Sequence, residues 1–597
     1  MRYLKAAMGI LLGITMAVSL WGCEGTDIPN GVNQKEVHEP ITVMTMFKNM
    51  SGFVDLVHEK YPEINLEVIP YSGENMSAYT SNQLKTNDMP DIYISTIYAP
   101  GQSDVSDRLI DLSGYAFTDN YLEARLHEVS DHGEIYMLPT SYTCIGITYN
   151  KTLLEKHGWK LPKSFRELEE LAPKVKEAGC RLALVQTEYP GYGFQYICNI
   201  LDTNFLNSMD GRKWQADFLE GKTTVAGNPQ MMEAMRVLEK WRDIGMLDGE
   251  GNPDSDYKTR KIMAEGNTLF LLGSTNILEE KDTTDEFGLM PYLSEDGSQN
   301  VLVMNVSRYV GLNKKLEEKG NEQKLEDAVH VVELLSTVEG MSKINESKAQ
   351  MELLPLKDFN VGEDNYYKDI EKELNAGLTA PFIYSGWDNL IVPIGETGIE
   401  YIKGNTTLKS VVDSFDDNQE LLNETNRISY TTVTEKIENE DCARLIGIAF
   451  AKACDADLSL ISLNKWYQLP DDSGLNYEGV SGCLFALPVT DQEITTILPT
   501  GWRGNIETVT LTGAQIEELI KKGYDRNGDG NTFPYKMIAP DSFIPEKNKT
   551  YKVVICGVTQ EVAEQGNLTD TGILGLDVMR EYFSRFPTFS KKDIKWE

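Results

Sequence analysis

The sequence predicts an α/β protein that consists of one long body and a smaller C-terminal domain of mixed α+β type. From Ile41 to about residue 415, predicted strands alternate with predicted helices, a pattern typical of a parallel sheet covered by helices on both faces. A polar stretch at 416–437 interrupts this pattern, and new strands and helices follow in 438–597. The chain of 597 residues is also too long for a single hydrophobic core, so several folding units are expected.

The elements of the first body can be read in order. Buried strands are predicted at "ITVMTMF", "INLEVIPY" and "DIYISTIY", with helical stretches between them. Two more strands, "EIYMLP" and "CIGITYN", precede a short helix, "KTLLEKHG", whose glycine stops it. Pro162 and Ser164 stand where the next helix should start, and Leu168, Leu171 and Val175 follow at helical spacing.

Charge and composition limit the partners that this chain can have. The net charge of −36 argues against nucleic acid, because few basic side chains are left to neutralise phosphates. An acidic surface also repels anionic lipid headgroups unless something tethers the protein to the membrane. Of the eight cysteines, seven lie singly in apolar or mixed stretches, without CxxC or zinc spacing, and are expected to be buried free thiols.

The eighth cysteine follows a leader segment. Arg2 and Lys5 precede an apolar run, Met8–Leu20, that is too short to cross a bilayer and is typical of a secretory signal peptide. The sequence Leu20-Trp21-Gly22-Cys23 resembles the lipobox of bacterial lipoproteins, although Trp21 stands where a small residue is preferred. The resemblance implies a signal peptide at 1–22, lipidation of Cys23 with diacylglycerol and palmitate, and a polar tether at 23–40. The alternative is an ordinary secreted protein.

The stretch from His132 to Trp159 resembles extracellular solute-binding proteins of ABC importers, the class that typically captures sugars. The family pattern Gly-x-x-Tyr-x-x-Pro, a Tyr-Asn-Lys strand end, a glycine and a proline-started helix is matched here by Gly133, Tyr136, Pro139, Tyr149, Asn150, Lys151, Gly158 and Pro162. Later stretches, including "RYVGLNKK" and "AVHVVELLSTVEGM", follow the family in order. The resemblance covers nearly all of 41–415.

This resemblance implies a two-lobed periplasmic-binding-protein-like body that closes about a hinge on a ligand in its cleft. The chain is expected to pass between the lobes three times. The first passage is predicted near Tyr142–Tyr149, the second after "NILEEK" (276–281), and the third near 340–355.

A carbohydrate ligand requires flat aromatic faces for its C–H surfaces and polar groups for its hydroxyls. The loops expected at the cleft supply such rings, and the candidate binding residues are Phe47, Tyr98, Tyr142, Tyr192 and Trp387. Tyr142, Tyr192 and Trp387 are favoured because glycine or polar residues flank them. For each ring the alternative is packing in a core.

The C-terminal stretch, 438–597, resembles the substrate-binding C-terminal domain of 5′-nucleotidases. The similarity runs through "DADLSLISLN", a glycine turn at Gly482, "EITTILPTG" and "VTLTGAQIEELI". In the last of these, a strand at Ile506–Leu511 leads into a helix that Thr512 should cap, with Gln515 as its capping-box partner.

The departures from that family argue against catalysis. Phe485 stands where the family has its substrate-binding arginine, and Thr500-Gly501-Trp502 follow Leu498-Pro499 where the family places its base-holding residues. The family's activity comes from a separate two-metal phosphatase domain, and this sequence contains no Asp-x-His or Asn-His-Asp/Glu motif. We therefore expect no nucleotidase activity and no catalytic residue, although Phe485 and Trp502 could stack a base or a sugar.

One further segment has a metal-binding spacing. In "DRNGDGN" (525–531), Asp525, Asn527 and Asp529 occupy positions one, three and five of a calcium loop, but Lys536 stands where a bidentate glutamate belongs. A glycine-rich Asx turn is the plainer interpretation, and no metal or cofactor is predicted.

Together these patterns predict a lipid-anchored solute receptor on the outer face of a bacterial membrane. It would bind a small solute, most simply a carbohydrate, pass it to ABC permease subunits and carry a non-catalytic C-terminal domain. Two alternatives remain open: a nucleotide-processing hydrolase whose metal domain is another chain, and a surface binding protein without a transport role.

Overall fold

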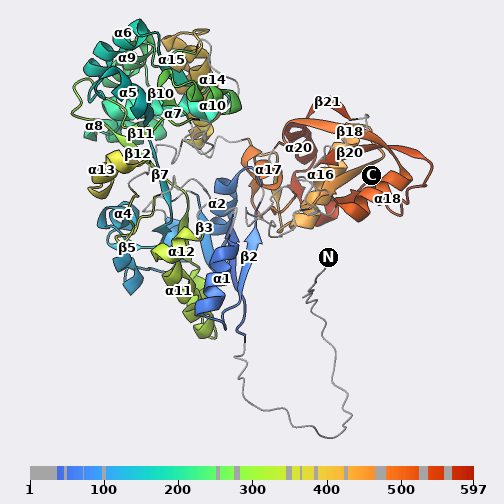
Figure 1. Cartoon of the computed structure of the whole chain (residues 1–597). Coiled ribbons are helices and arrows are strands. Elements are labelled where there is room, and N and C mark those ends of the chain that lie inside the picture. The colour runs from blue at the N-terminus through green and yellow to red at the C-terminus, as the bar shows by residue number, and fades with distance from the viewer. Residues whose placement is uncertain are drawn as a thin grey trace, which may run out of the picture.

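The computed structural model describes residues 37–45, 50–71, 73–96, 98, 103–249, 256–273, 283–344, 353–362, 366–381, 387–422, 428–463, 479–499, 501–523, 535–556 and 568–596. Within these ranges the chain forms two lobes and a C-terminal domain (Figure 1). Each of the three has its own buried apolar cluster. The lipidation candidate Cys23, the aromatic candidate Phe47 and the loop 525–531 lie outside the described residues.

Lobe 1 is built on a five-stranded sheet in the order β2-β1-β3-β13-β6. Its strands are β2 (Leu66–Pro70), β1 (Ile41–Thr45), β3 (Ile92–Ser95), β13 (Tyr309–Leu312) and β6 (Leu138–Pro139). β1 pairs in parallel with both of its neighbours, whereas β13 runs antiparallel to β3. The other elements of this lobe are α1 (Ser51–Lys60), α2 (Met76–Thr86), α3 (Ser103–Arg108), η1 (Ala116–Asn120), α4 (Glu123–Val129), β4 (Ser130–Asp131), β5 (Glu134–Ile135), η4 (Lys314–Glu317), α11 (Glu322–Leu335) and α12 (Val338–Ser342).

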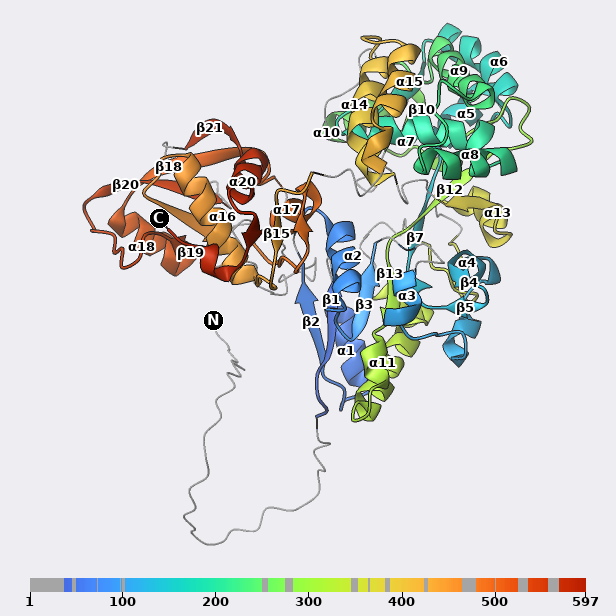
Figure 2. The same cartoon turned by 180° about the vertical axis from the view of Figure 1, so that it is seen from behind.

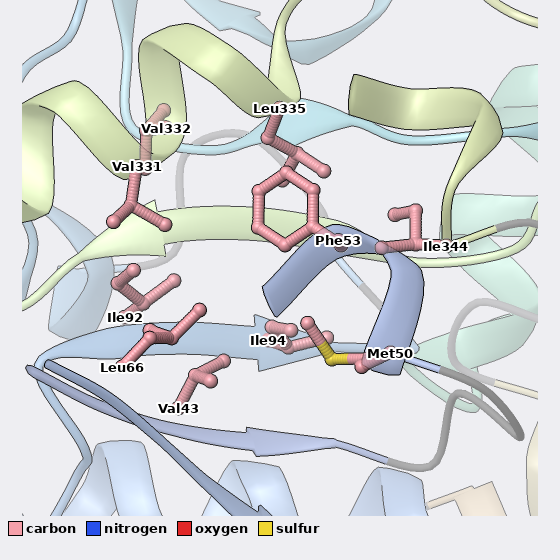
Figure 3. Close-up of a pocket in the computed structure, with 10 residues that line it drawn as sticks. All are labelled: Val43, Met50, Phe53, Leu66, Ile92, Ile94, Val331, Val332, Leu335 and Ile344. Carbon is pink, nitrogen blue, oxygen red and sulfur yellow. The ribbon is translucent and has the colours of Figure 1, made fainter. Parts of the chain in front are cut away.

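The core of lobe 1 is close-packed. Ten apolar side chains from β1, β2 and β3, from the helices α1 and α11, and from Met50 and Ile344 beside α1 and α12 point toward one another (Figure 3). The cavity between them is only about 10 Å³, which is room for about one water molecule. This cavity is therefore a packing defect and not a solute site.

Lobe 2 contains a four-stranded sheet in the order β11-β8-β10-β9. Its strands are β11 (Phe287–Met290), β8 (Ile147–Asn150), β10 (Thr268–Leu272) and β9 (Arg181–Val185). The helices around it are α5 (Lys151–His157), α6 (Phe165–Glu177), α7 (Pro190–Leu201), the π-helical turn η2 (Asp202–Leu206), α8 (Met209–Leu219), α9 (Pro229–Asp243), α10 (Asp256–Ala264), η6 (Asp388–Leu390), α14 (Ile391–Ile402), α15 (Leu408–Asp417) and η7 (Gln419–Leu422).

The helix signals predicted for this region are confirmed. The side chain of Asn150 caps α5, which ends at Gly158 in the left-handed conformation with φ of 65°. The side chain of Ser164 accepts a hydrogen bond from the Glu167 amide and caps α6. Leu168, Leu171 and Val175 are the buried face of that helix, as the spacing predicted.

Three chain segments join the lobes through a small sheet in the order β14-β12-β7. These strands are β14 (Thr379–Pro381), β12 (Leu302–Val306) and β7 (Tyr142–Ile145). The first passage lies where it was predicted. The second comes later than predicted, because β11 still pairs with β8 in lobe 2 and β12 makes the passage.

The third passage also extends beyond its predicted range. Leu354 and Leu356 pack in the core of lobe 1, whereas Asp369, in η5 (Lys368–Ile370), accepts a hydrogen bond from Tyr149 of lobe 2 at 2.6 Å. Helix α13 (Glu371–Asn375) follows, and β14 then runs parallel to β12 before the chain enters η6. Residues 353–362 and 366–381 therefore belong to a long hinge segment with its own apolar cluster.

The C-terminal domain has a five-stranded sheet in the order β19-β16-β20-β18-β21 and a small sheet in the order β17-β15-β22. Its elements are β15 (Thr431–Val433), α16 (Asn439–Ala453), β16 (Leu458–Ser462), β17 (Pro488–Val489), α17 (Asp491–Ile497), β18 (Asn505–Thr512), α18 (Gly513–Lys522), β19 (Tyr535–Ile538), β20 (Thr550–Cys556), β21 (Thr569–Leu574), α20 (Gly575–Ser584), β22 (Thr588–Phe589) and η9 (Lys591–Asp593). This mixed arrangement of strands and helices is an α+β domain.

The range 416–437, predicted as a linker, is only partly a connection. Gln419 in η7 donates to the carbonyl oxygens of Phe218 and Thr223 at 2.7 Å each and so belongs to lobe 2. β15 pairs with β17 and β22 and so belongs to the C-terminal domain. The polar composition marked the boundary, but these backbone and side-chain hydrogen bonds could not be predicted from it.

Candidate functional site

The sheet topology places a defined set of loops at the boundary between the lobes. The chain passes from lobe 2 along the hinge strand β12 and continues directly into β13 of lobe 1. Tyr309, at the start of β13, therefore lies at the edge nearest lobe 2. Its pairing partner Ser95 is the carboxyl end of β3. In lobe 2, Val185 and Leu272 are the paired carboxyl ends of β9 and β10, and the antiparallel strand β8 begins beside them at Ile147, directly after the hinge. Ligands of open α/β sheets bind at such carboxyl edges.

On the lobe 1 side, Tyr98, Tyr309 and Glu128 form the polar and aromatic part of this edge. The rings of Tyr98 and Tyr309 lie 5.6 Å apart at 57°, and the Tyr98 hydroxyl donates to the Val129 carbonyl at 3.2 Å. Glu128 keeps 30% of its side chain exposed, and burial raises the pKa of its carboxyl to about 7. Such a ring pair can cover the C–H surface of a sugar, and a nearby carboxyl group can form hydrogen bonds with its hydroxyls.

Arg125 lies behind this edge and connects it to the hinge. Its guanidinium is 1% exposed and lies 3.1 Å from the Glu128 carboxylate. It also contacts one residue of each hinge strand: the Tyr142 ring of β7 at 5.5 Å, the Met304 sulfur of β12 and the Thr379 hydroxyl of β14 at 2.9 Å. Arg125 therefore joins Glu128 to all three hinge strands by direct contacts.

On the lobe 2 side, the loop after β9 carries Glu188 and Tyr189, and Tyr192 follows in α7. Tyr189 is 60% exposed, and its ring stands edge-on to that of Tyr192 at 5.7 Å between centroids. Both carboxylate oxygens of Glu188 are covered and have no hydrogen-bond partner among the residues that the structure describes. An unpaired buried carboxylate is costly, so Glu188 is a position where a bound hydroxyl or water could be accommodated.

The structure brings together only some of the predicted ligand residues. Tyr192 lies partly exposed at the lobe 2 edge, next to Tyr189. Tyr98 lies at the lobe 1 edge but is only 7% exposed. Tyr142 is buried in the hinge cluster and is not at a ligand-accessible surface.

Trp387 is a correction to the predicted site. Its side chain is 1% exposed and packs among Phe194, Trp214, Phe218 and Phe415, with ring centroids 5.4–6.5 Å away. The polar residues beside Trp387 suggested a cleft loop, but the neighbours that enclose its ring come from α7, α8 and α15, distant in sequence. Trp387 is thus a core residue of lobe 2.

Sequence reasoning missed Tyr309, Glu128, Arg125 and Glu188. Tyr309 stands within "RYVGLNKK", one of the stretches that follow the family in order, and Glu188 lies four residues before the candidate Tyr192. Glu128 and Arg125 carried no sequence signal, because only tertiary packing of α4 against the hinge gives them their surroundings. Phe485, predicted as a possible stacking ring, is 5% exposed and packs against Tyr79 of lobe 1 at 5.4 Å. A base or sugar cannot stack on it in this arrangement.

Within the described residues, no group of three or more His, Cys, Asp or Glu side chains is placed to hold a metal ion. No helix in the same part of the chain is long and apolar enough to span a bilayer. A hollow of about 860 Å³ beside Arg181–Ala183 and Arg242–Gly245 lies at the amino end of β9, away from the lobe boundary.

Comparison with known proteins addresses the first body. Residues 47–307 match the sequence model of the bacterial extracellular solute-binding protein family. The match thus lies within the first body. An uncharacterized ABC transporter extracellular-binding protein of Pyrococcus horikoshii is 23% identical over 239 residues, which are 37% of this chain and 56% of that relative. The chain thus spans little more than half the length of this curated relative.

Solved structures show the same fold for the first body. RafE in complex with raffinose matches with a TM-score of 0.51 at 16% identity, covering 64% of this chain and all of that one. The binding protein MsmE of Bacillus subtilis, in an open conformation, matches with a TM-score of 0.52 at 13% identity, covering 65% of this chain and 98% of its own. At such identities these likenesses establish the two-lobed fold and nothing about the ligand.

Proposed function

We propose that this chain is a lipid-anchored extracellular receptor of an ABC importer that binds a carbohydrate between lobes 1 and 2. The observation that carries this proposal is the pair of facing sheet edges in a solute-binding body. One edge presents Tyr98, Tyr309 and Glu128, and the other presents Glu188, Tyr189 and Tyr192. The three hinge strands allow the two edges to approach each other about a ligand.

The carbohydrate class is supported by the chemistry of these edges. Aromatic rings cover the C–H faces of a sugar, while carboxylates accept hydrogen bonds from its hydroxyls. Raffinose, the ligand of the structurally similar RafE, is a suitable first probe. A probe at about 100 times its dissociation constant should stabilise the folded protein by roughly 2.7 kcal/mol.

The test is a thermal-shift and calorimetric measurement with raffinose on the wild type and two Tyr309 variants. Tyr309→Ala removes the ring and should weaken binding about tenfold, by analogy with aromatic stacking on bases, which is worth about 1–3 kcal/mol. Tyr309→Phe keeps the ring and is the matched control, expected to retain most of the affinity. If neither raffinose nor any sugar in a wider screen shifts the unfolding temperature, the carbohydrate proposal fails.

Lipid anchoring rests on the apolar leader that ends in Leu20-Trp21-Gly22-Cys23. Stable anchoring requires two lipid signals, since a single chain gives only marginal membrane binding. The Cys23→Ser protein should appear in the medium, whereas the wild type should sediment with membranes. Retention of Cys23→Ser in the membrane fraction would contradict the proposal.

The competing proposal is a nucleotide-processing hydrolase. Phe485 in place of the family's arginine, and its burial against Tyr79, argue against it. The full protein, incubated with nucleoside monophosphates and manganese, zinc or magnesium, should release no phosphate. Metal-dependent release would establish an enzyme in place of a receptor. Permease genes beside the coding gene would favour import over a binding role without transport.

A further inference from the structure

The C-terminal domain docks on lobe 1 through an apolar cluster shared by the two. Lobe 1 contributes Met44, Tyr71, Met76 and Tyr79, and the C-terminal domain contributes Cys483, Phe485 and Leu487. The Tyr79 hydroxyl lies 3.0 Å from the Cys483 sulfur, and the Tyr71 hydroxyl donates to the Thr496 carbonyl at 2.8 Å. Such a desolvated centre is typical of a stable interface.

Charged and backbone contacts surround this apolar cluster. The Glu74 amide donates to the Leu498 carbonyl at 3.0 Å, and its carboxylate accepts from the Gly501 amide at 3.0 Å and lies 3.3 Å from Arg503. Lys436 pairs with Asp88 at 2.8 Å. At Gly73 a Cβ would meet the Thr496 carbonyl oxygen at 2.3 Å, so the two backbones approach at a distance that only glycine allows. The C-terminal domain is thus fixed in position on lobe 1.

The same domain also contacts lobe 2. Gln492 in α17 donates from Nε2 to the Oδ1 of Asn389 at 3.0 Å, and Asn389 donates to the Leu421 carbonyl at 2.8 Å. Asn389 lies in η6, directly before α14 of lobe 2. Helix α17, which packs on α2 of lobe 1, therefore connects the two lobes at a place separate from the hinge.

The positions of these two connections matter for lobe movement. The hinge strands β7 and β12 lie on one side of lobe 1 and α17 lies on the other, in both views (Figures 1 and 2). In a hinge motion, displacement grows with distance from the hinge, so the Gln492–Asn389 contact lies where the lobes separate more than at the hinge itself.

We infer that the C-terminal domain is a brace between the lobes: it is docked on lobe 1 and holds lobe 2 through Gln492 and Asn389, so that it restricts opening of the body. This inference goes beyond the proposed function. Only one consequence rests on the proposed function. A brace that restricts opening would slow release of a solute held between the lobes.

The experiment compares two full-length variants that share the substitution Asn389→Asp. Combined with Gln492→Glu, it places two like charges at the contact. Combined with Gln492→Lys, it places an ion pair there. Because both variants carry Asn389→Asp, both lose the Asn389–Leu421 hydrogen bond, and they differ only in the charge at position 492. These two variants and a reference chain with the native residues at 389 and 492 all carry Cys23→Ser and Cys180→Ser. In each, fluorophores on Glu318→Cys of lobe 1 and Glu177→Cys of lobe 2 report the distance between lobes without any ligand.

The like-charge pair should shift the distribution of inter-lobe distances toward more separated lobes. The ion pair should give the same distribution as the chain with the native residues at 389 and 492. Identical distributions in all three chains would overturn the brace. In a second readout, the like-charge pair should release raffinose about two- to tenfold faster than the ion pair, the effect of one hydrogen bond of about 0.5–1.5 kcal/mol. If raffinose does not bind any chain, the carbohydrate proposal is affected, whereas the distance measurement still decides the brace.

Discussion

At the scale of single residues, flanking sequence proved a weak guide to which aromatic rings could meet a ligand. Trp387 and Tyr192 were both selected because glycine or polar residues flank them, yet Trp387 is enclosed by four aromatic rings and Tyr192 is partly exposed at the lobe edge. Whether a ring is free for a ligand depends on what covers it, and the covering side chains come from distant helices.

Replacement of Trp387 should therefore affect stability rather than binding. Trp387→Ala removes a buried ring from the lobe 2 core and should lower the free energy of unfolding by about 3–5 kcal/mol. Urea denaturation measures this loss, with Tyr189→Ala, an exposed ring of the same lobe, as a control expected within about 0.5 kcal/mol of the wild type. If Trp387→Ala left the free energy of unfolding nearly unchanged and instead abolished raffinose binding, Trp387 would be a binding residue after all.

Glu128 should make the free energy of unfolding depend measurably on pH. Its pKa rises from an ordinary value of 4.5 to about 7 through burial, while Arg125 opposes the shift. The facing phenols of Tyr142 and Tyr309 have pKa values of about 12 and stay neutral. Between about pH 4.5 and 7 the folded protein binds more protons at Glu128 than the unfolded chain does, so this group makes stability fall as pH rises.

The measurement for Glu128 is the free energy of unfolding from pH 4.5 to 8 for the wild type and Glu128→Gln. All other groups titrate alike in both chains, so the difference isolates Glu128. The variant should gain stability relative to the wild type as pH rises through this window. A constant difference across the window would show that Glu128 titrates normally in the folded state.

At the scale of elements, helix ends were the features that the sequence predicted well. The strand predicted at 506–511 is β18, and Thr512 and Gln515 form the predicted capping box at the start of α18. The Gln515 amide donates to the Thr512 hydroxyl oxygen at 3.3 Å, and the Thr512 amide donates to Gln515 Oε1 at 2.8 Å. Capping depends on residues three positions apart, so it can be identified without knowledge of the fold.

Removal of this cap should destabilise the C-terminal domain. Thr512→Ala leaves an amide of the first helical turn without its side-chain partner and should cost about 0.5–2 kcal/mol in the free energy of unfolding. Thr510→Ala, an exposed position two residues earlier on β18, is the matched control. Equal unfolding midpoints for the two variants in urea would show that the box contributes nothing.

At the scale of the whole molecule, the C-terminal domain is not an independent appendage. Its docking covers Tyr71, Met76 and Tyr79 of lobe 1, which a chain ending at Leu422 would expose to water. Uncovered apolar surface of this kind leads to association. The domain itself keeps two apolar clusters of its own, so it should fold in isolation.

Truncation after Leu422 should accordingly lower the unfolding temperature of the first body and increase its binding of a hydrophobic dye. Thermal scans and dye fluorescence on the full chain and the truncated chain measure both effects. The isolated chain 428–597 should still unfold cooperatively. If the truncated chain has the same unfolding temperature and dye fluorescence as the full protein, the docked face contributes little to stability.

The sequence by itself determined the features that depend on neighbouring residues and on motif order. These are the alternation of strands and helices, the capped helix starts, and the pattern from Gly133 to Pro162 that resembles solute-binding proteins. Only the tertiary structure decided which side chains face the lobe boundary, that Arg125 contacts all three hinge strands, and that Phe485 is covered by Tyr79. Local patterns set hydrogen bonds within a few residues, whereas burial and charge at a site are set by chain segments hundreds of residues apart.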